Sequence, residues 1–145
     1  MTNLSITQII YEQLGGDRFA LMTGAKDFVS TTDTSLHITL SKNASGCNRL
    51  SITLEPNDTY TMLFYKMTKK RGTMDYVLSK GAVAEEVFYD ELQDYFTNHT
   101  KQYTKFNQEI NTSKVCDAIE NVEGFIVEQA YKAVMAKKNY NKKRA

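Results

Sequence analysis

The chain has 145 residues, of which 41% are hydrophobic and 24% are charged. This length suffices for one hydrophobic core, and the composition is that of ordinary globular proteins, which excludes disordered and fibrous classes. The formal net charge of +1 hides an asymmetry, because residues 1–136 carry 13 bases against 17 acids and the remaining five bases lie in the last nine positions. We therefore expect a single domain over residues 1–136 and a basic tail over residues 137–145. A mildly acidic body argues against nucleic-acid binding over the whole surface.

The cellular context is limited by what the sequence lacks. The two cysteines, Cys47 and Cys116, have no CxxC spacing, which favours a reducing compartment over a disulfide scaffold. The first residues lack a basic region followed by a long apolar run, and no stretch approaches the roughly 18 apolar residues that a membrane span needs. We expect a cytoplasmic protein with no membrane partner.

The first predicted element is a helix over residues 6–14. Ser5 and Gln8 have the spacing of a capping box, and the two glycines that follow the apolar face suit a left-handed helix end. The short apolar run Phe19–Met22, which stops at Thr23 and a glycine, then predicts a strand.

A series of strands follows. Residues 36–40 and 50–54 alternate apolar with polar side chains, whereas residues 59–68 are apolar on both faces, which predicts a central strand. A polar turn at residues 69–72 leads to a last strand at residues 76–78.

Two helices are predicted after the strands. Apolar residues at helical spacing predict one helix over residues 83–98, and a second, long helix is predicted to begin at Thr112 or Ser113, with an apolar stripe running from Val115 to Val134. The sequence thus predicts an α+β fold with an N-terminal helix, a four- to five-stranded antiparallel meander and two C-terminal helices packed on the sheet. The apolar stripe of the last helix would also allow self-association into a homo-oligomer.

Catalytic residues are not grouped in the sequence. His37 and His99 lie on opposite sides of the predicted meander, and neither has metal-ligand spacing with another histidine, a cysteine or a carboxylate. Cys47 lies in a loop and could act as a nucleophile beside a histidine, but a lone loop cysteine is weak support for that role. We predict a protein without catalytic residues, metal site or cofactor.

The first of three candidate binding surfaces is a basic hairpin. Its cations could meet phosphates while a base stacks on a flanking tyrosine, although a lysine-rich turn that discourages edge-to-edge aggregation explains the pattern equally well. The residues of this candidate nucleic-acid site are Lys66, Lys69, Lys70, Arg71, Tyr65 and Tyr76.

The second candidate surface is the basic tail, which contains no acid. Such tails attract nucleic acid through counterion release, and they also serve as plain solubilising ends. The residues concerned are Lys137, Lys138, Tyr140, Lys142, Lys143 and Arg144.

The third candidate surface is acidic. Five acids and no bases occur in residues 83–98, three of them at four-residue spacing, which would form one negative ridge on the predicted helix. The ridge could meet a basic partner protein, or it could be an ordinary solvated face. The acids are Glu85, Glu86, Asp90, Glu91 and Asp94.

A set of short sequence runs stands together over about residues 5–104. It consists of LGG after the first helix, MTGAK before Phe28, a strand–turn–strand that ends in DTY, and an aromatic helix. This pattern resembles a family of small uncharacterised proteins encoded by phages and prophages. The resemblance implies an accessory protein of a phage or mobile element in a bacterial cytoplasm, where such proteins most often bind nucleic acid or disable a host protein.

The expected function is therefore non-enzymatic binding of nucleic acid, single-stranded in preference, through the basic hairpin and tail. The alternative is a protein-binding inhibitor or adaptor of a host defence or nucleic-acid enzyme that uses the acidic helix face.

Overall fold

The computed structural model describes residues 5–106, 108–109 and 113–132. It has an α+β fold built on one antiparallel sheet of six strands, in which every strand pairs with the next one along the chain. The α+β meander is confirmed, with more strands than predicted. The elements are α1 (Ile6–Leu14), α2 (Gly16–Thr23), β1 (Lys26–Thr32), β2 (Ser35–Thr39), β3 (Arg49–Leu54), β4 (Tyr60–Lys69), β5 (Tyr76–Val87), α3 (Leu92–Thr100) and β6 (Asp117–Ile119), followed by helical residues 122–132.

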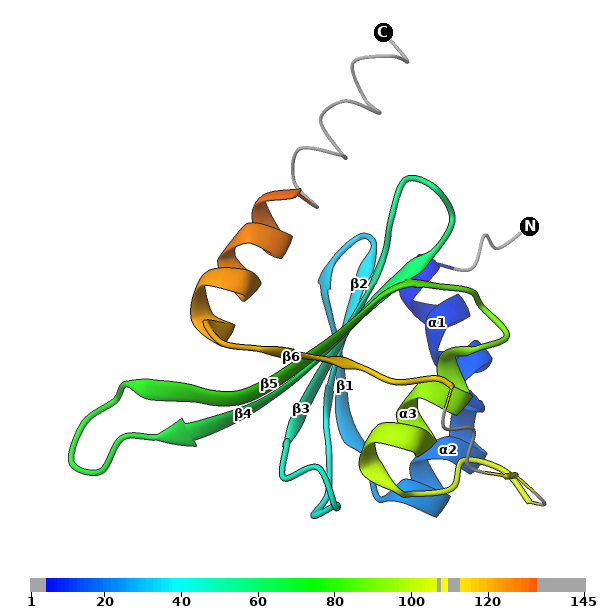
Figure 1. Cartoon of the computed structure of the whole chain (residues 1–145), viewed down its shortest axis with the longest axis horizontal. Helices are drawn as coiled ribbons and strands as arrows, with labels where there is room; N and C mark the ends of the chain where they lie inside the picture. The colour runs from blue at the N-terminus through cyan, green and yellow to red at the C-terminus, as the bar shows by residue number, and fades with distance from the viewer. Residues whose placement is uncertain (1–4, 107, 110–112, 133–145) are drawn as a thin grey trace, which may run out of the picture.

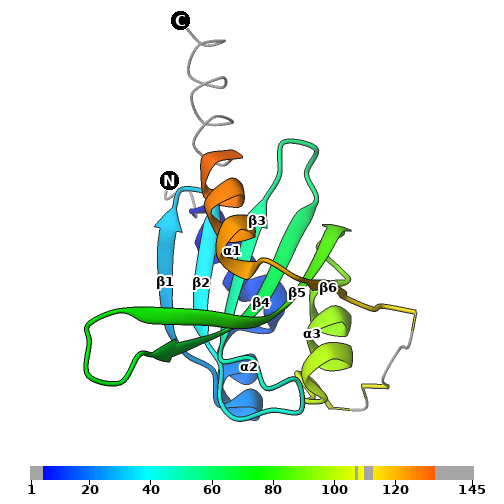
Figure 2. The same cartoon turned by 60° about the vertical axis from the view of Figure 1, so that its left-hand side comes forward.

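The two faces of the sheet are covered differently. Helices α1, α2 and α3 pack on one face, and the helix of residues 122–132 lies across the other (Figures 1 and 2). The first face holds the main core, which includes Leu14, Phe19, Phe64 and Phe96. A smaller cluster of Leu63, Tyr65 and Val122 occupies the second face, under that helix. Among the described residues, every helix is too short or too polar to span a lipid bilayer.

Helix α1 begins and ends as its local sequence predicts. The Ser5 hydroxyl accepts a hydrogen bond from the backbone N–H of Gln8 at 3.2 Å, which caps the first turn. Gly15 ends the helix with a φ of 121°, a conformation that is costly for a residue with a Cβ atom. The capping prediction is therefore confirmed.

The strand predicted at Phe19–Met22 is wrong, because these residues belong to α2. Phe19 and Thr23 are buried four residues apart on one side of the helix, and the Thr23 hydroxyl donates to the Phe19 carbonyl at 2.7 Å. Leu21 is 84% exposed on the opposite side. An apolar run of four residues does not distinguish a strand from a buried helix turn, and the chain restarts a helix directly after Gly15.

The helix predicted over residues 83–98 is also wrong in its first half. Strand β5 continues to Val87, which pairs with Tyr60 of β4, and α3 begins only at Leu92. A bulge places an extra residue in β5 between Ala84 and Val87, with Glu86 at a φ of 55°. This extra residue shifts the strand alternation, so the apolar spacing mimics a helical period across the bulge.

The last helix begins later than predicted. Residues Asp117–Ile119 form β6, which pairs with Gly81–Val83, and the helix starts at Val122. The side chain of Asn121 caps it, accepting from the backbone N–H of Gly124 at 2.9 Å. Residue 134, at the end of the predicted stripe, lies outside the described residues. Val127 and Tyr131 are exposed on the outer side of this helix, and self-association through it stays a prediction.

Strand β1 has no counterpart in the sequence prediction. It forms the edge of the sheet beside β2 and is mostly exposed, so it lacks the apolar alternation that marks a half-buried strand. A second bulge occurs here, with Asp27 at a φ of 54°. The bulge interrupts the edge and thereby blunts it against pairing with another chain.

Candidate nucleic-acid interface

The basic hairpin of the sequence prediction is the outer half of β4 and β5, residues 66–80, which we call the basic arm. The ladders with the neighbouring strands β3 and β6 end at Tyr65 and Gly81, so beyond these residues β4 and β5 pair with each other alone. The resulting two-stranded ribbon projects well beyond the rest of the sheet (Figure 1). A six-residue turn closes it, in which the N–H of Lys70 donates to the Asp75 carbonyl at 2.8 Å.

The base of the basic arm is held by a side chain that the sequence prediction missed. The Asn48 amide donates to the Met67 carbonyl at 2.9 Å and accepts from the Met67 N–H at 2.8 Å. These two bonds imitate a pair in a strand ladder and fix the direction in which the arm leaves the sheet. At the same level a bulge places Lys80 at a φ of 49°, which adds local twist to β5.

The charge of the basic arm contrasts with that of the rest of the protein. Its five cations, with Asp75 as the one acid, give it a net charge of +4. The other described residues contain eight basic and sixteen acidic side chains, a net of −8. The ion pairs within the described ranges, Lys114–Glu91 and Lys132–Glu128, both lie outside the arm. The five arm cations are Lys66, Lys69, Lys70, Arg71 and Lys80.

One of the two predicted stacking tyrosines is accessible. Tyr76 is 59% exposed on the basic arm, close to Met74, which is 84% exposed at the turn. Tyr65 is 2% exposed, so its prediction as a stacking surface is wrong. The Tyr65 ring packs with Leu63 and Val122 under the last helix, and burial raises the pKa of Tyr65 to about 12. Strand alternation does not reveal that a later helix covers this face.

The basic tail lies outside the described residues, so its predicted site residues Lys137, Lys138, Tyr140, Lys142, Lys143 and Arg144 are not placed. Their part in nucleic-acid binding stays a prediction.

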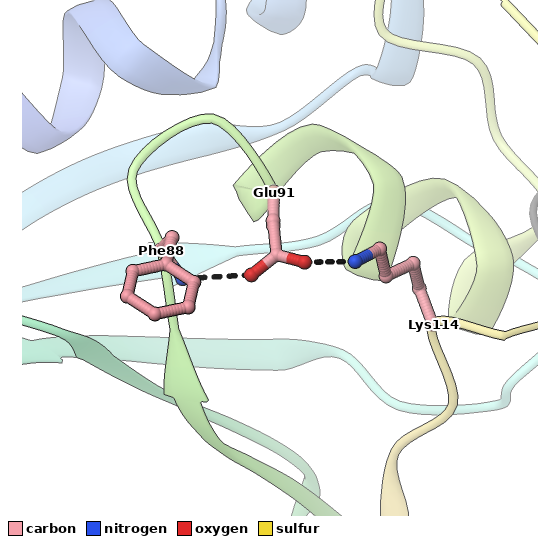
Figure 3. Close-up of polar contacts among 3 residues, drawn as sticks. All are labelled: Phe88, Glu91 and Lys114. Atoms are coloured by element: carbon pink, nitrogen blue, oxygen red, sulfur yellow. Dashed lines mark hydrogen bonds and ion pairs between the residues drawn. The ribbon is translucent and has the colours of Figure 1, made fainter.

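The predicted acidic ridge does not form on one helix. Glu85 and Glu86 lie on β5, Asp90 and Glu91 lie in the turn that follows, and Asp94 is the member within α3. Glu91 is engaged inside the fold, where its carboxylate accepts from the Phe88 N–H at 3.1 Å and pairs with Lys114 (Figure 3). The alternative function as a protein-binding inhibitor stays a prediction, without the helix face on which it depended.

Cys47 and His99 lie closer together than the sequence suggested. The Cys47 Sγ is 4.0 Å from His99 Nε2, and the imidazole packs on the Phe64 ring with centroids 4.4 Å apart. Burial raises the pKa of the Cys47 thiol and lowers that of His99, so both groups favour their neutral forms. Cys47 is 4% exposed and donates to the Lys80 carbonyl at 3.5 Å. These features are those of a packed core pair, since a nucleophilic cysteine needs access and an easily formed thiolate. Within the described ranges, no three histidine, cysteine or carboxylate side chains gather closely enough to hold a metal ion.

We expect stability to fall as the pH is lowered below about 6.5, the ordinary pKa of histidine. Burial lowers the pKa of both His37 and His99 below 6.5, and Arg49 and Lys101 respectively lower them further. The unfolded chain then binds more protons than the folded chain in this window, so acid favours unfolding, while the full stability is retained above pH 6.5. Chemical denaturation at several pH values measures the slope. The double variant His37→Gln, His99→Gln has no histidine left and should lose most of it; an unchanged slope would contradict this assignment.

A second group of polar side chains lies on the sheet face opposite α1–α3, beside the base of the basic arm. The strand register brings Arg49 next to Tyr65 and places His37 one strand further along. His37 Nε2 and the Tyr65 hydroxyl are hydrogen-bonded. These residues line a pocket of about 230 Å³, whose lining also includes Asp27 and Val29 of the edge strand.

The comparisons with known proteins add no relative to these observations. No protein-family model, no curated protein and no solved structure matches the chain.

Proposed function

We propose that this protein binds nucleic acid, single-stranded in preference to duplex, through the basic arm, as a non-enzymatic accessory protein. The observation that carries the proposal is the separation of charge, with +4 on a projecting ribbon and −8 on the other described residues. A polyanion gains counterion-release free energy at such an arm and is repelled by most of the body, so binding is centred on the arm. The context of a phage or mobile element rests on the sequence resemblance over residues 5–104.

The preference for single strands is supported by the apolar side chains of the basic arm. Met74, Tyr76 and Val77 are all about half exposed or more. Unpaired bases present faces that stack on such side chains, whereas the bases of a duplex are already stacked on each other. The arm thus joins cations to a surface for bases, which is the combination that single-strand binding uses.

The test is a fluorescence-anisotropy titration of labelled single- and double-stranded oligonucleotides between about 50 and 200 mM salt. Single-strand affinity should fall steeply with salt, and the double variant Lys70→Ala, Arg71→Ala should reduce the logarithmic salt slope by about 1.4, since each single-strand phosphate contact contributes about 0.7. Affinity at low salt should drop about tenfold or more.

The matched control is the double variant Arg18→Ala, Lys105→Ala. It removes the same charge from exposed positions on the helical side of the molecule, so it should leave affinity and slope nearly unchanged. Equal losses in the two double variants would mean that net charge, and not the basic arm, attracts the oligonucleotide. Absence of binding at low salt would overturn the proposal itself.

A further inference from the structure

The pocket of about 230 Å³ on the sheet face opposite α1–α3 has an arginine available for a ligand. Arg49 is half-buried, and its Nη1 donates to the Asn48 carbonyl at 3.0 Å, which uses one of its five N–H groups. Neither ion pair among the described residues involves Arg49. A guanidinium of this kind, beside hydroxyl and imidazole groups, is suited to a phosphate.

The neighbouring side chains define what the rest of a ligand would meet. Burial, with a smaller contribution from Arg49, lowers the pKa of His37, so the imidazole is uncharged at neutral pH. It can then take part in hydrogen bonds while Arg49 supplies the positive charge for the phosphate. Met67 and Val29 supply apolar walls on either side of His37 and Arg49. A charged centre between apolar walls fits a phosphate that is attached to a sugar and base better than a free anion.

The pocket is continuous with the basic arm. Tyr65, Met67 and Lys69 occupy every second position of β4, so their side chains point to the same face of the sheet. Lys69 lies about 13 Å from Tyr65 along the strand, given about 3.3 Å per residue. This span places Lys69, the first arm cation of β4 on this face, within a few nucleotides of Arg49.

We propose that Arg49 and His37, with the buried Tyr65 hydroxyl holding the His37 ring, form a phosphate-binding pocket that takes the backbone of a single nucleic-acid strand as it passes from the basic arm onto the sheet face. This inference rests on the proposed function for the identity of the ligand. Tyr65 lines the pocket and also packs with Val122 of the helix of residues 122–132, so the pocket lies beside that helix, and we expect a single strand to reach Arg49 more easily than a rigid duplex. Figure 2 shows that helix in front of the sheet, with the arm extending below it.

A substitution of Asp27 should strengthen binding, which is the opposite effect to that of removing Arg49. Asp27 lines the same pocket and its carboxylate would repel a phosphate there, so Asp27→Asn should strengthen oligonucleotide binding about two- to threefold. Asparagine adopts the left-handed backbone of position 27 as readily as aspartate, which keeps the bulge intact.

The experiment compares variants of the whole chain with an oligothymidylate of about 12 nucleotides, which is within the usual site size, and with a duplex of equal length. Arg49→Gln should weaken oligothymidylate binding about tenfold and reduce the salt slope by about 0.7, with little effect on the duplex. Arg18→Gln, which removes a charge on the helical side, should change neither. An equal loss for duplex and single strand, or a loss of affinity in Asp27→Asn, would overturn the inference.

Proton NMR of the two histidines provides an independent readout. His37 lines the pocket, whereas His99 lies on the opposite face of the sheet among α3 residues, so oligothymidylate should shift the His37 imidazole resonances and leave those of His99 in place. Unshifted His37 signals would overturn the inference. Equal shifts with inorganic phosphate alone, at the same phosphate concentration, would assign the pocket to a free anion and overturn it as well.

Different results would contradict binding at the pocket and binding at the basic arm. If oligothymidylate binding weakens in Lys70→Ala, Arg71→Ala and not in Arg49→Gln, the basic arm binds nucleic acid and the pocket takes no part. If the unmodified protein does not bind oligothymidylate at low salt, the proposed function itself is wrong.

Discussion

Replacing residues 68–77 by an Asn-Gly turn is expected to weaken single-strand binding about 100- to 1,000-fold at low salt. The replacement removes three cations, each good for a charge-assisted phosphate contact, together with a stacking surface that contributes about 1–3 kcal/mol per base. Met67 and Leu78 face each other across the ribbon, so an Asn-Gly turn joins them in a two-residue hairpin. The lost residues include Lys69, Lys70, Arg71, Met74 and Tyr76.

The shortened protein should keep its fold, because Met67 and Leu78 are the arm side chains that pack against the second cluster and both are retained. A thermal melt followed by circular dichroism measures this. A full-length control with Lys69→Gln, Lys70→Gln and Arg71→Gln keeps the ribbon and its tyrosine, so its salt slope should fall by about 2.1 while part of the affinity is retained. Undiminished affinity in the shortened protein would show that binding occurs elsewhere.

Gly81→Ala is expected to lower the free energy of unfolding by about 2 kcal/mol through overpacking. Gly81 lies where β5 meets both β6 and the last helix, and an added Cβ atom would overlap with Val122 Cγ2 and lie 3.2 Å from Ile119 Cβ. The helix of residues 122–132 must then move away from the sheet. Denaturant unfolding measures the loss, and amide hydrogen exchange shows whether it is concentrated in that helix.

The control for this effect is the variant Val122→Ala, alone and combined with Gly81→Ala. Truncating Val122 removes the atom with which the new Cβ collides, so the double variant should be more stable than the sum of the single effects by about 1–2 kcal/mol. Strictly additive effects would locate the cost of Gly81→Ala in the backbone and not in this contact.

What could be predicted from the sequence depended on how local the cause was. The cap at Ser5, the stop at Gly15 and the alternation in β2, β3 and β4 all act within a few residues, and the structure confirms them. Helix α2 and the extension of β5 were missed because their apolar residues are few and their pairing partners are distant. For short segments, tertiary context overrides local pattern.

The candidate site also has a part that the local sequence predicts and a part that it does not. The basic arm could be predicted because its lysines sit at a turn between two strands, a pattern visible within fifteen residues. The orientation of Tyr65 depends on a helix more than fifty residues later, and its meeting with His37 and Arg49 depends on the register of three strands. Register is a property of the paired sheet, so no spacing along the chain reveals the pocket.

The meander has one long connection, and it matters for the second face of the sheet. The links between β1 and β5 are short, the longest being residues 40–48, whereas residues 88–116 separate β5 from β6. Loop-closure entropy therefore opposes the three-residue β5–β6 ladder more than any other pairing. The helix of residues 122–132 is therefore held against the sheet mainly by the burial of Val122, Ile119 and Phe125. These three side chains, and not strand pairing, determine how firmly Leu63 and Tyr65 are shielded from water.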